Sequence, residues 1–277
     1  MNRLLAVPEI FLVAALLLGL LATFTACDNP LSDSGDGDSD EEAEETNPDP
    51  EPEPDPEPEP GPEPEPGPEP EPGPEPEIPE AVLRGGIVVN EILPDPTGSP
   101  GVDTDGDGTA TATDEFIELY NAGNETVDLG GLELWDPGAR RWFTFPDDSP
   151  LPPDACALVT VRVAEGGALP VLGPEDLAFD AGRSTGVLNN GGDNVIVLEP
   201  ESAHYLQLTY DGLAAVDPAL DLGPYGFPAH AELAGDVQRW GEHAAGTSLA
   251  RSPDGTGDPL LHLDLGEPAS PGRSNDG

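Results

Sequence analysis

The chain has 277 residues, of which 9 are basic and 56 are acidic, and all nine basic residues are arginine. A surface of this sign repels phosphate backbones, so the composition argues against nucleic acid as a partner and favours cations and basic surfaces. Aromatic residues make up only 5%, whereas glycine and proline number 34 and 36, a balance typical of short strands joined by turns rather than of a helical bundle.

Residues 1–26 are predicted to be an export signal. Arg3 is followed by an apolar run and by small residues just before Cys27, which is the layout of a bacterial secretory signal peptide. The ending FTAC resembles a lipoprotein box, with Phe24 where an aliphatic residue is usual, and implies that Cys27 is acylated after cleavage. Several acyl chains would make a durable membrane anchor, since one chain alone binds only marginally. The alternative is an uncleaved transmembrane helix, because residues 10–26 are about long enough to span a bilayer.

The predicted location is the bacterial cell envelope, with the protein exported and lipid-anchored. The outer membrane or cell surface is favoured. Asp28, directly after the cysteine, resembles an inner-membrane retention signal of some bacteria, so the inner membrane stays open as an alternative.

Residues 27–80 are predicted to be a disordered acidic stalk. They hold 22 acidic residues and no basic one, and most of them form an imperfect Glu-Pro repeat punctuated by glycine. Proline lacks a donor N–H and apolar residues are scarce, so no packed core can form. Proline favours the extended polyproline II conformation, and the repeat would hold the folded part on the order of 100 Å from the membrane.

From residue 86 the sequence changes to short β-prone runs bounded by turn residues. No window shows a 3.6-residue apolar period over three turns, so the pattern predicts an all-β sandwich or barrel. In the run EFIELYN, Ile117 and Leu119 are expected to point into the core, whereas Phe116 and Tyr120 pack under a loop or at the rim. The predicted strands are 87–93, 115–121, 132–136, 141–145, 156–163, 194–199 and 205–211.

Several of these runs carry recognisable motifs. IVVNEILPDP, followed by DEFIELYNAGNETVDLGGLELWD, resembles the opening of bacterial lamin-tail domains, and FTFPDDSPLPPDACALVTV and VLNNGGDNVIVLE resemble later elements of that family. The segments SLARSPDG and EPASPGRSNDG are similar to its closing elements. The resemblance to bacterial lamin-tail-domain lipoproteins covers about residues 86–275 and implies an immunoglobulin-like β-sandwich. Residues 81–277 are therefore assigned to one such domain, in which residues 212–240 match the family least and are expected to form a long loop or insert.

The Asn-Glu motif of the first strand also has an explanation that needs no family. Asn90 and Glu91 lie toward the end of the predicted strand, where side chains can bond exposed backbone groups of a neighbouring segment. This motif therefore indicates a fold and no reaction chemistry.

The stretch DTDGDGTATATDEF places three aspartates at alternate positions, then a glycine, with a further acid eleven residues after the first. This spacing matches the calcium loop D-x-D-x-D-G, closed by aspartate rather than the usual glutamate, although Glu115 is adjacent. Without flanking helices it would stiffen a loop rather than act as a sensor, with a dissociation constant of roughly 10⁻⁴–10⁻³ M. The alternative is a solvated acidic turn. The candidate calcium ligands are Asp103, Asp105, Asp107, the backbone carbonyl of Thr109 and Asp114, and Thr111 could add a direct or water-mediated contact.

No catalytic constellation is recognised. The four histidines form no zinc-binding spacing, and the sequence has neither a nucleophile elbow nor a phosphate-cradling glycine loop. His204 beside Glu199 and Glu201 is interpreted as surface electrostatics, and Cys156 as a small buried hydrophobe. Core or rim packing is expected for Trp135, Trp142 and Trp240.

The sequence thus predicts a non-catalytic surface lipoprotein that presents a lamin-tail-type sandwich, stabilised by calcium, for protein binding, adhesion or envelope organisation. The alternative is an accessory or substrate-capturing component of an exported hydrolase system. An enzyme in its own right lacks a supporting group of residues. The predicted partners are the membrane, through the lipid anchor, and a protein or envelope component.

Overall fold

The structure, a computed structural model, describes residues 81–275. The predicted signal peptide (1–26), Cys27 and the predicted stalk (27–80) lie outside the described residues. Within residues 81–275, no helix has the length and apolar character needed to cross a bilayer.

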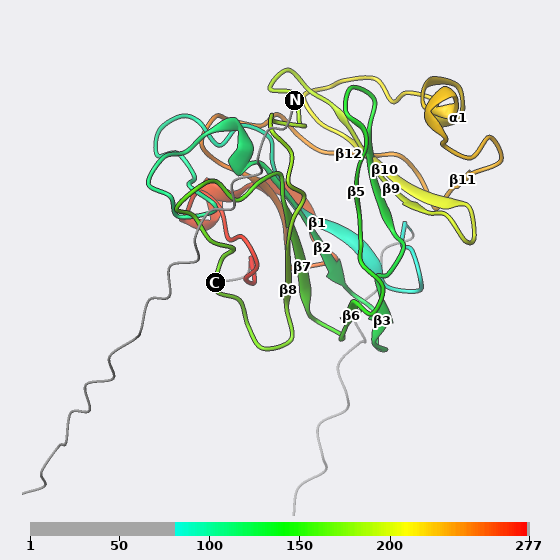
Figure 1. The fold of residues 1–277 in the computed structure, drawn as a ribbon, viewed down its shortest axis with the longest axis horizontal. Helices are drawn as coiled ribbons and strands as arrows, with labels where there is room; N and C mark the ends of the chain where they lie inside the picture. The colour runs from blue at the N-terminus through cyan, green and yellow to red at the C-terminus, as the bar shows by residue number, and fades with distance from the viewer. Residues whose placement is uncertain (1–80, 276–277) are drawn as a thin grey trace, which may run out of the picture. The chain divides into compact units, whose positions relative to one another are not determined.

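Two large sheets form the domain (Figure 1). Their strands are antiparallel except where 156–160 pairs with 177–180 and where 204–209 pairs with 232–233 and 238–239. In spatial order the first sheet contains β14 (Asp258–Leu261), β13 (Leu249–Ser252), β1 (Ile87–Leu93), β2 (Phe116–Asn121), β7 (Cys156–Thr160) and β8 (Leu177–Asp180). The second contains β11 (Glu232–Leu233), β10 (His204–Thr209), β9 (Asn194–Glu199), β4 (Glu133–Asp136) and β5 (Arg140–Thr144), with β12 (Gln238–Arg239) also paired to β10.

The remaining elements are short and lie in the connections. They are the ribbon of β3 (Val127–Asp128) and β6 (Pro150–Leu151), the helix α1 (Pro218–Asp221), and the 3₁₀ turns η1 (Ala112–Asp114), η2 (Gly223–Tyr225) and η3 (His262–Leu265).

All seven predicted strands are present, and β1 and β9 have the predicted bounds. β7 ends three residues before its predicted end, because the chain leaves the sheet there: the amide of Arg162 donates to the carbonyl of Thr113, and that of Val163 to Asp180. The seven strands without a counterpart in the prediction have only two to four residues, too few to show an alternating pattern.

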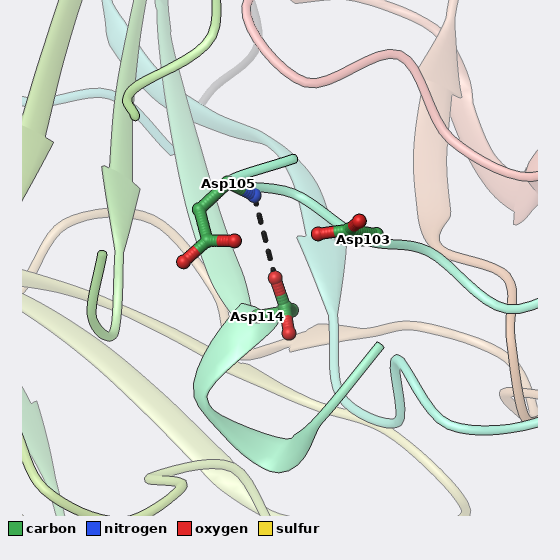
Figure 2. Close-up of side chains that lie close together, drawn as sticks. All are labelled: Asp103, Asp105 and Asp114. Atoms are coloured by element: carbon green, nitrogen blue, oxygen red, sulfur yellow. Dashed lines mark hydrogen bonds between the residues drawn. The ribbon is translucent and has the colours of Figure 1, made fainter. Parts of the chain in front are cut away.

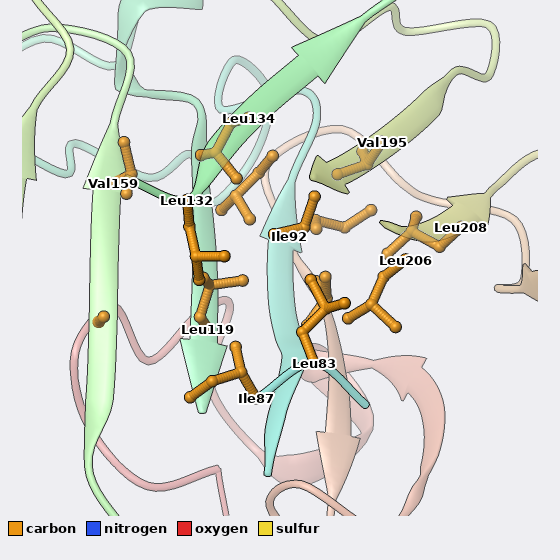
Figure 3. Packing of buried hydrophobic residues seen from close by; sticks show 14 of the residues in the cluster. Leu83, Ile87, Ile92, Leu119, Leu132, Leu134, Val159, Val195, Leu206 and Leu208 are labelled. Carbon is orange, nitrogen blue, oxygen red and sulfur yellow. The ribbon is translucent and has the colours of Figure 1, made fainter. Parts of the chain in front are cut away.

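The core lies between the two sheets. Ile117 and Leu119 on β2 have no exposed surface and point into it, as predicted. Figure 3 shows how the first sheet contributes side chains such as Ile92, which meet Leu134 and Leu206 of the second sheet. Each fully buried aliphatic side chain contributes about 1.5–3 kcal/mol, so this all-apolar layer is the main source of stability. The prediction of an all-β sandwich is confirmed.

The outer face of the first sheet is covered as well. Phe116 is fully buried against Leu93, Val102, Leu158 and Ala269. Val102 precedes the acidic loop and Ala269 belongs to the carboxyl-terminal segment, so both segments shield this face from water. The expected packing of Phe116 under a loop is therefore confirmed.

The segment 212–240 packs over the outer face of the second sheet. Its helix α1 begins at Pro218 after the cap Asp217, whose carboxylate accepts the amides of Ala219 and Leu220. Downstream, Phe227 lies edge-on to Trp135 of β4, with ring centroids 5.4 Å apart. The insert is therefore a structured cover with its own short elements.

A bulge in β1 determines which side chains reach the outer face. The register of β1 against β2 shifts between Val89 and Glu91, so that Val89 pairs with Leu119 and Glu91 pairs with Glu118. The extra residue, Asn90, is left without a partner in the ladder. Because of this bulge, two carboxylates face each other across neighbouring strands.

Arg251 of β13 bonds β1, β12 and the residue that precedes β14. Its guanidinium donates to the carbonyls of Val89 and Gly257 and to Oε1 of Gln238 on β12, and it lies 5.5 Å from the ring centroid of Trp240. Burial lowers its pKa from the ordinary value. Because a buried guanidinium is costly without acceptors, these three bonds favour the observed pairing of β13 with β1.

Candidate functional site

The acidic loop connects β1 to β2, and three of its carboxylates converge (Figure 2). Asp103 and Asp105 come from the extended part of the loop and Asp114 from η1, and each offers one oxygen within 4.8 Å of the others. Calcium–oxygen bonds are about 2.3–2.6 Å long, so oxygens on opposite sides of one ion lie about 5 Å apart. The three carboxylates therefore fit the size and ligand preference of calcium.

Asp114 organises this loop. Its Oδ1 accepts the amides of Thr104 (2.9 Å) and Asp105 (3.3 Å), and its Oδ2 accepts the amide and the hydroxyl of Thr111. Burial raises its pKa, against the effect of these hydrogen bonds. Hydrogen bonds from the loop itself thus hold Asp114, the closing acid of the motif, in place.

Asp103 and Asp105 are held by backbone amides in the same way. Asp103 accepts from Gly108 (2.7 Å) and Asp107 (3.2 Å), while Asp105 accepts from Asp107 and, across the fold, from Ala164 (2.5 Å). These N–H dipoles supply part of the positive charge that lets the acids approach one another. A carboxylate oxygen with one such bond keeps a lone pair for a further ligand.

Asp107, the fourth predicted carboxylate ligand, lies outside this group. Asp107 and Thr109 are exposed, and the Asp107 carboxylate accepts the Thr109 amide. Thr111 is the N-cap of η1, where its hydroxyl accepts the Thr113 amide. Glu115 points away from the loop. The structure therefore brings together three of the four predicted carboxylate ligands.

Glu115 instead accepts the amides of Val187 (2.6 Å) and Leu188 (2.8 Å). It is 2% exposed, and burial raises its pKa to about 7 despite these bonds. A carboxyl group next to the acidic loop therefore takes up its proton near neutral pH.

A second buried carboxyl group, Asp136 at the end of β4, has no counterpart in the sequence analysis. Burial, and then the neighbouring Asp193, raise its pKa to about 8. One of its oxygens accepts the amide of Ala139, while the other is buried without a donor. A proton held between Asp136 and Asp193 would satisfy that oxygen. Asp136 belongs to the segment LELWD and Asp193 to the segment NNGGDN, and only the fold brings the two acids together.

The Asn-Glu motif of β1 binds the carboxyl-terminal segment. Asn90 accepts the amide of Gly255 and donates to Asp254 and to Glu118. Glu118 accepts the amide of Gly272 at 2.7 Å. The expectation that the motif bonds a neighbouring segment is confirmed, and Glu118 is the partner that sequence reasoning missed.

Glu91 completes this buried network through two serines. Its carboxylate accepts the Ser248 hydroxyl and the Ser270 amide, and it lies 3.0 Å from the Ser270 hydroxyl. The same hydroxyl lies 2.8 Å from Nε2 of His262. A serine beside a histidine is the start of a hydrolytic triad, but here both side chains are at most 1% exposed and the acid contacts the serine rather than the imidazole. The group therefore holds the chain rather than attacking a substrate.

The other residues considered for catalysis are dispersed. His204 is exposed, and its ring lies 4.0 Å from Glu232 rather than next to Glu201. His243 is held by Asp211, with Nδ1 and Oδ2 2.6 Å apart. Cys156 is buried, and the three tryptophans are 2–5% exposed, as expected for core residues.

We predict that Glu115→Gln flattens the pH dependence of stability. The folded-state pKa of about 7 lies above the ordinary value of 4.5, so the folded protein binds the proton more tightly and its free energy of unfolding falls as pH rises between these values, by about 3 kcal/mol. Urea unfolding from pH 4.5 to 8 measures the slope. Asp136 also makes the free energy of unfolding fall with pH, up to about pH 8, and it does so in the parent protein and in Glu115→Gln alike.

The matched control is Glu125→Gln, which removes a charge from an exposed side chain. It is expected to leave the slope of the parent protein unchanged. Equal slopes for the parent protein and Glu115→Gln would contradict the assignment of this proton to Glu115.

The family comparison agrees with this geometry. Residues 83–212 match the model of the Lamin Tail Domain, a family of non-catalytic immunoglobulin-like domains. No curated protein matches the chain. The match begins before β1 and ends just after β10, so it contains Asn90, Glu91 and Glu118 but not the carboxyl-terminal segment that they bind. Residues 83–212, just under half of the chain, are thus similar to lamin tail domains.

Proposed function

We propose that this protein is a membrane-anchored surface lipoprotein whose lamin tail domain is a non-catalytic module for protein binding, adhesion or envelope organisation. The observation that carries the proposal is the order of segments in the sequence. An apolar run ends at Cys27, an anionic proline-rich stretch follows at once, and the folded domain comes last. This order suits a module held away from a lipid surface.

The burial of the reactive side chains supports a binding role. The Ser270 hydroxyl and the His262 ring are enclosed by the carboxyl-terminal segment, where no substrate can reach them. Burial raises the pKa of the Cys156 thiol far above its ordinary value, which keeps it protonated and a poor nucleophile. The functional surface of the domain is then its charged exterior.

We also propose that the acidic loop binds calcium. Asp103, Asp105 and Asp114 would hold the ion, and an Asp114 oxygen would exchange one of its two hydrogen bonds for the contact with calcium. Bound calcium supplies the positive charge that three close carboxylates lack. It would also stiffen the 164–168 segment, since the Asp105 carboxylate accepts the Ala164 amide and the Asp105 carbonyl accepts the Ala168 amide.

The anchor is tested by labelling cells with radioactive palmitate. Because Cys27 and Cys156 are the two cysteines, we expect Cys27→Ala to abolish the label and Cys156→Ala to retain it fully. Label that persists in Cys27→Ala would contradict a lipid anchor at this position.

Calcium is expected to raise the melting temperature of the protein. With a dissociation constant of about 1 mM, 10 mM calcium adds about 1.4 kcal/mol. This corresponds to a rise of about 3 °C for a domain of this size. Asp103→Asn removes one of the three converging carboxylates and should lower the rise to about 1 °C or less.

Asp107→Asn is the matched control, since it removes an equal charge from the same loop but outside the converging group. It should keep most of the calcium effect. Equal losses in the two variants would show a diffuse attraction to an acidic loop rather than a site.

The binding role is tested by capture from native envelopes, with the full chain as bait in calcium and then in a chelator. We expect envelope polymers or structural proteins to be retained in calcium, with partial release on chelation. Consistent retention of a nuclease or phosphatase would instead assign the protein to an exported hydrolase system, as an accessory component.

A further inference from the structure

The strand β5 lies at the border of the second sheet and pairs with β4 on one side (Figure 1). Within residues 81–275, no strand pairs with its other side. It has five residues and no proline, whereas the edge strand β14 of the first sheet is shorter and contains Pro259. An open strand edge offers backbone donors and acceptors to which a further extended chain can add.

Thr144 presents its backbone to this open edge. The Phe145 amide donates to the Leu132 carbonyl, and the Phe145 carbonyl accepts the Gly131 amide, so the backbone of Phe145 faces β4. Successive residues of a strand direct their N–H and C=O groups to opposite sides. The N–H and C=O of Thr144 therefore point away from β4, and its side chain is exposed.

The residues on either side of Thr144 carry opposite charges at matched distances. The segment reads RRWFTFPDD, which places Arg140 and Arg141 before the threonine and Asp147 and Asp148 after it. All four charged side chains are exposed. When two copies of the segment lie antiparallel with their Thr144 residues opposite each other, residue 140 of one copy faces residue 148 of the other, and 141 faces 147. Arginines of each copy then meet aspartates of the other at both ends.

The charges disfavour other pairings of the same edge. A parallel pair in register would set arginine against arginine and aspartate against aspartate. An antiparallel pair shifted toward the amino-terminal ends would bring the two arginine pairs together. The order of charges therefore selects the symmetric register centred on Thr144. Because a twofold pairing uses the same edge of both copies, it closes at a dimer.

Both arginines keep donors for a second chain. The Arg140 guanidinium donates to the Gly138 carbonyl and to the Tyr225 hydroxyl, and Arg141 donates through one nitrogen to Glu133. A guanidinium carries five N–H donors, so each arginine can make further bonds to a carboxylate.

We propose that β5 is a self-association site, at which two copies of this chain pair antiparallel about Thr144 and join their second sheets. The inference goes beyond the proposed function and depends on neither the lipid anchor nor calcium. Its carrying observation is the open backbone of Thr144, flanked at equal distances by an arginine pair and an aspartate pair.

The association is expected to be weak and reversible. Pro146 has no N–H, so the ladder between the copies is limited to the residues next to Thr144. A contact along one strand edge is smaller than the roughly 1,200 Å² of a stable interface. A cross-link at the twofold position is therefore the suitable probe, because it traps the pair as it forms.

Thr144→Cys in the full chain, kept in detergent, tests the pairing. At the twofold position each cysteine faces its own copy, with Cα atoms about 5.5 Å apart, which a disulfide can span. Under mild oxidation we expect a linked dimer on a non-reducing gel, formed about tenfold faster than with Thr126→Cys. Thr126 is the matched control because it is also an exposed threonine and lies outside β5. The parent chain gives the background from Cys27 and Cys156, and equal rates in the two variants would overturn the proposal.

Charge reversal at Asp147 tests the register. Adding Asp147→Arg to Thr144→Cys sets arginine against Arg141 at both ends of the dimer. It should slow cross-linking about tenfold, because one substitution acts twice in a symmetric pair. Adding Glu125→Arg instead makes the same change of charge at an exposed residue outside β5 and should leave the rate unchanged. Equal rates in these two double variants would also overturn the proposal.

Discussion

The structure depends on how the outer face of the first sheet accommodates two opposed carboxylates. Glu91 and Glu118 form a cross-strand pair with no exposed surface, a position where like charges destabilise a sheet. Burial raises the pKa of both, and for Glu118 the neighbouring Glu91 adds to the effect. Asn90 of β1 donates to Glu118, and other donors to this pair, Ser248, Ser270 and Gly272, come from the other end of the chain. Residues 248–275 are therefore part of the folded domain, although the family match ends at residue 212.

The same requirement explains the bulge in β1. In a regular strand, side chains two residues apart lie on the same face. Without the extra residue, Glu91 would therefore point, like Val89, into the apolar layer between the sheets, away from its donors. The bulge rotates Glu91 outward and leaves Asn90 free to bond Gly255 and Asp254. One irregular residue thus places a polar network on one face of the strand and keeps the other face apolar.

The sequence predicts the longer strands because they are runs of β-prone residues bounded by turn residues. β1 and β9 illustrate this, since each is buried on both faces and is rich in apolar residues. It also predicts the approach of Asp103 and Asp105, since their spacing is local. It cannot predict contacts that depend on tertiary packing. Glu115 follows the motif directly and yet points to Val187 and Leu188, and Asp136 meets Asp193 only because β4 and β9 are neighbours.

The distribution of acids over the domain gives a common physical basis for its proposed functions. Burial raises the pKa of Glu115 to about 7 and that of Asp136 to about 8, so protons remove charge from the interior near neutral pH. In the acidic loop, Asp103 is partly exposed whereas Asp105 and Asp114 are buried. Three carboxylates this close together favour a cation of ionic size, which is the basis of the proposed calcium site. A domain held on an anionic stalk would keep this site clear of neighbouring envelope lipids.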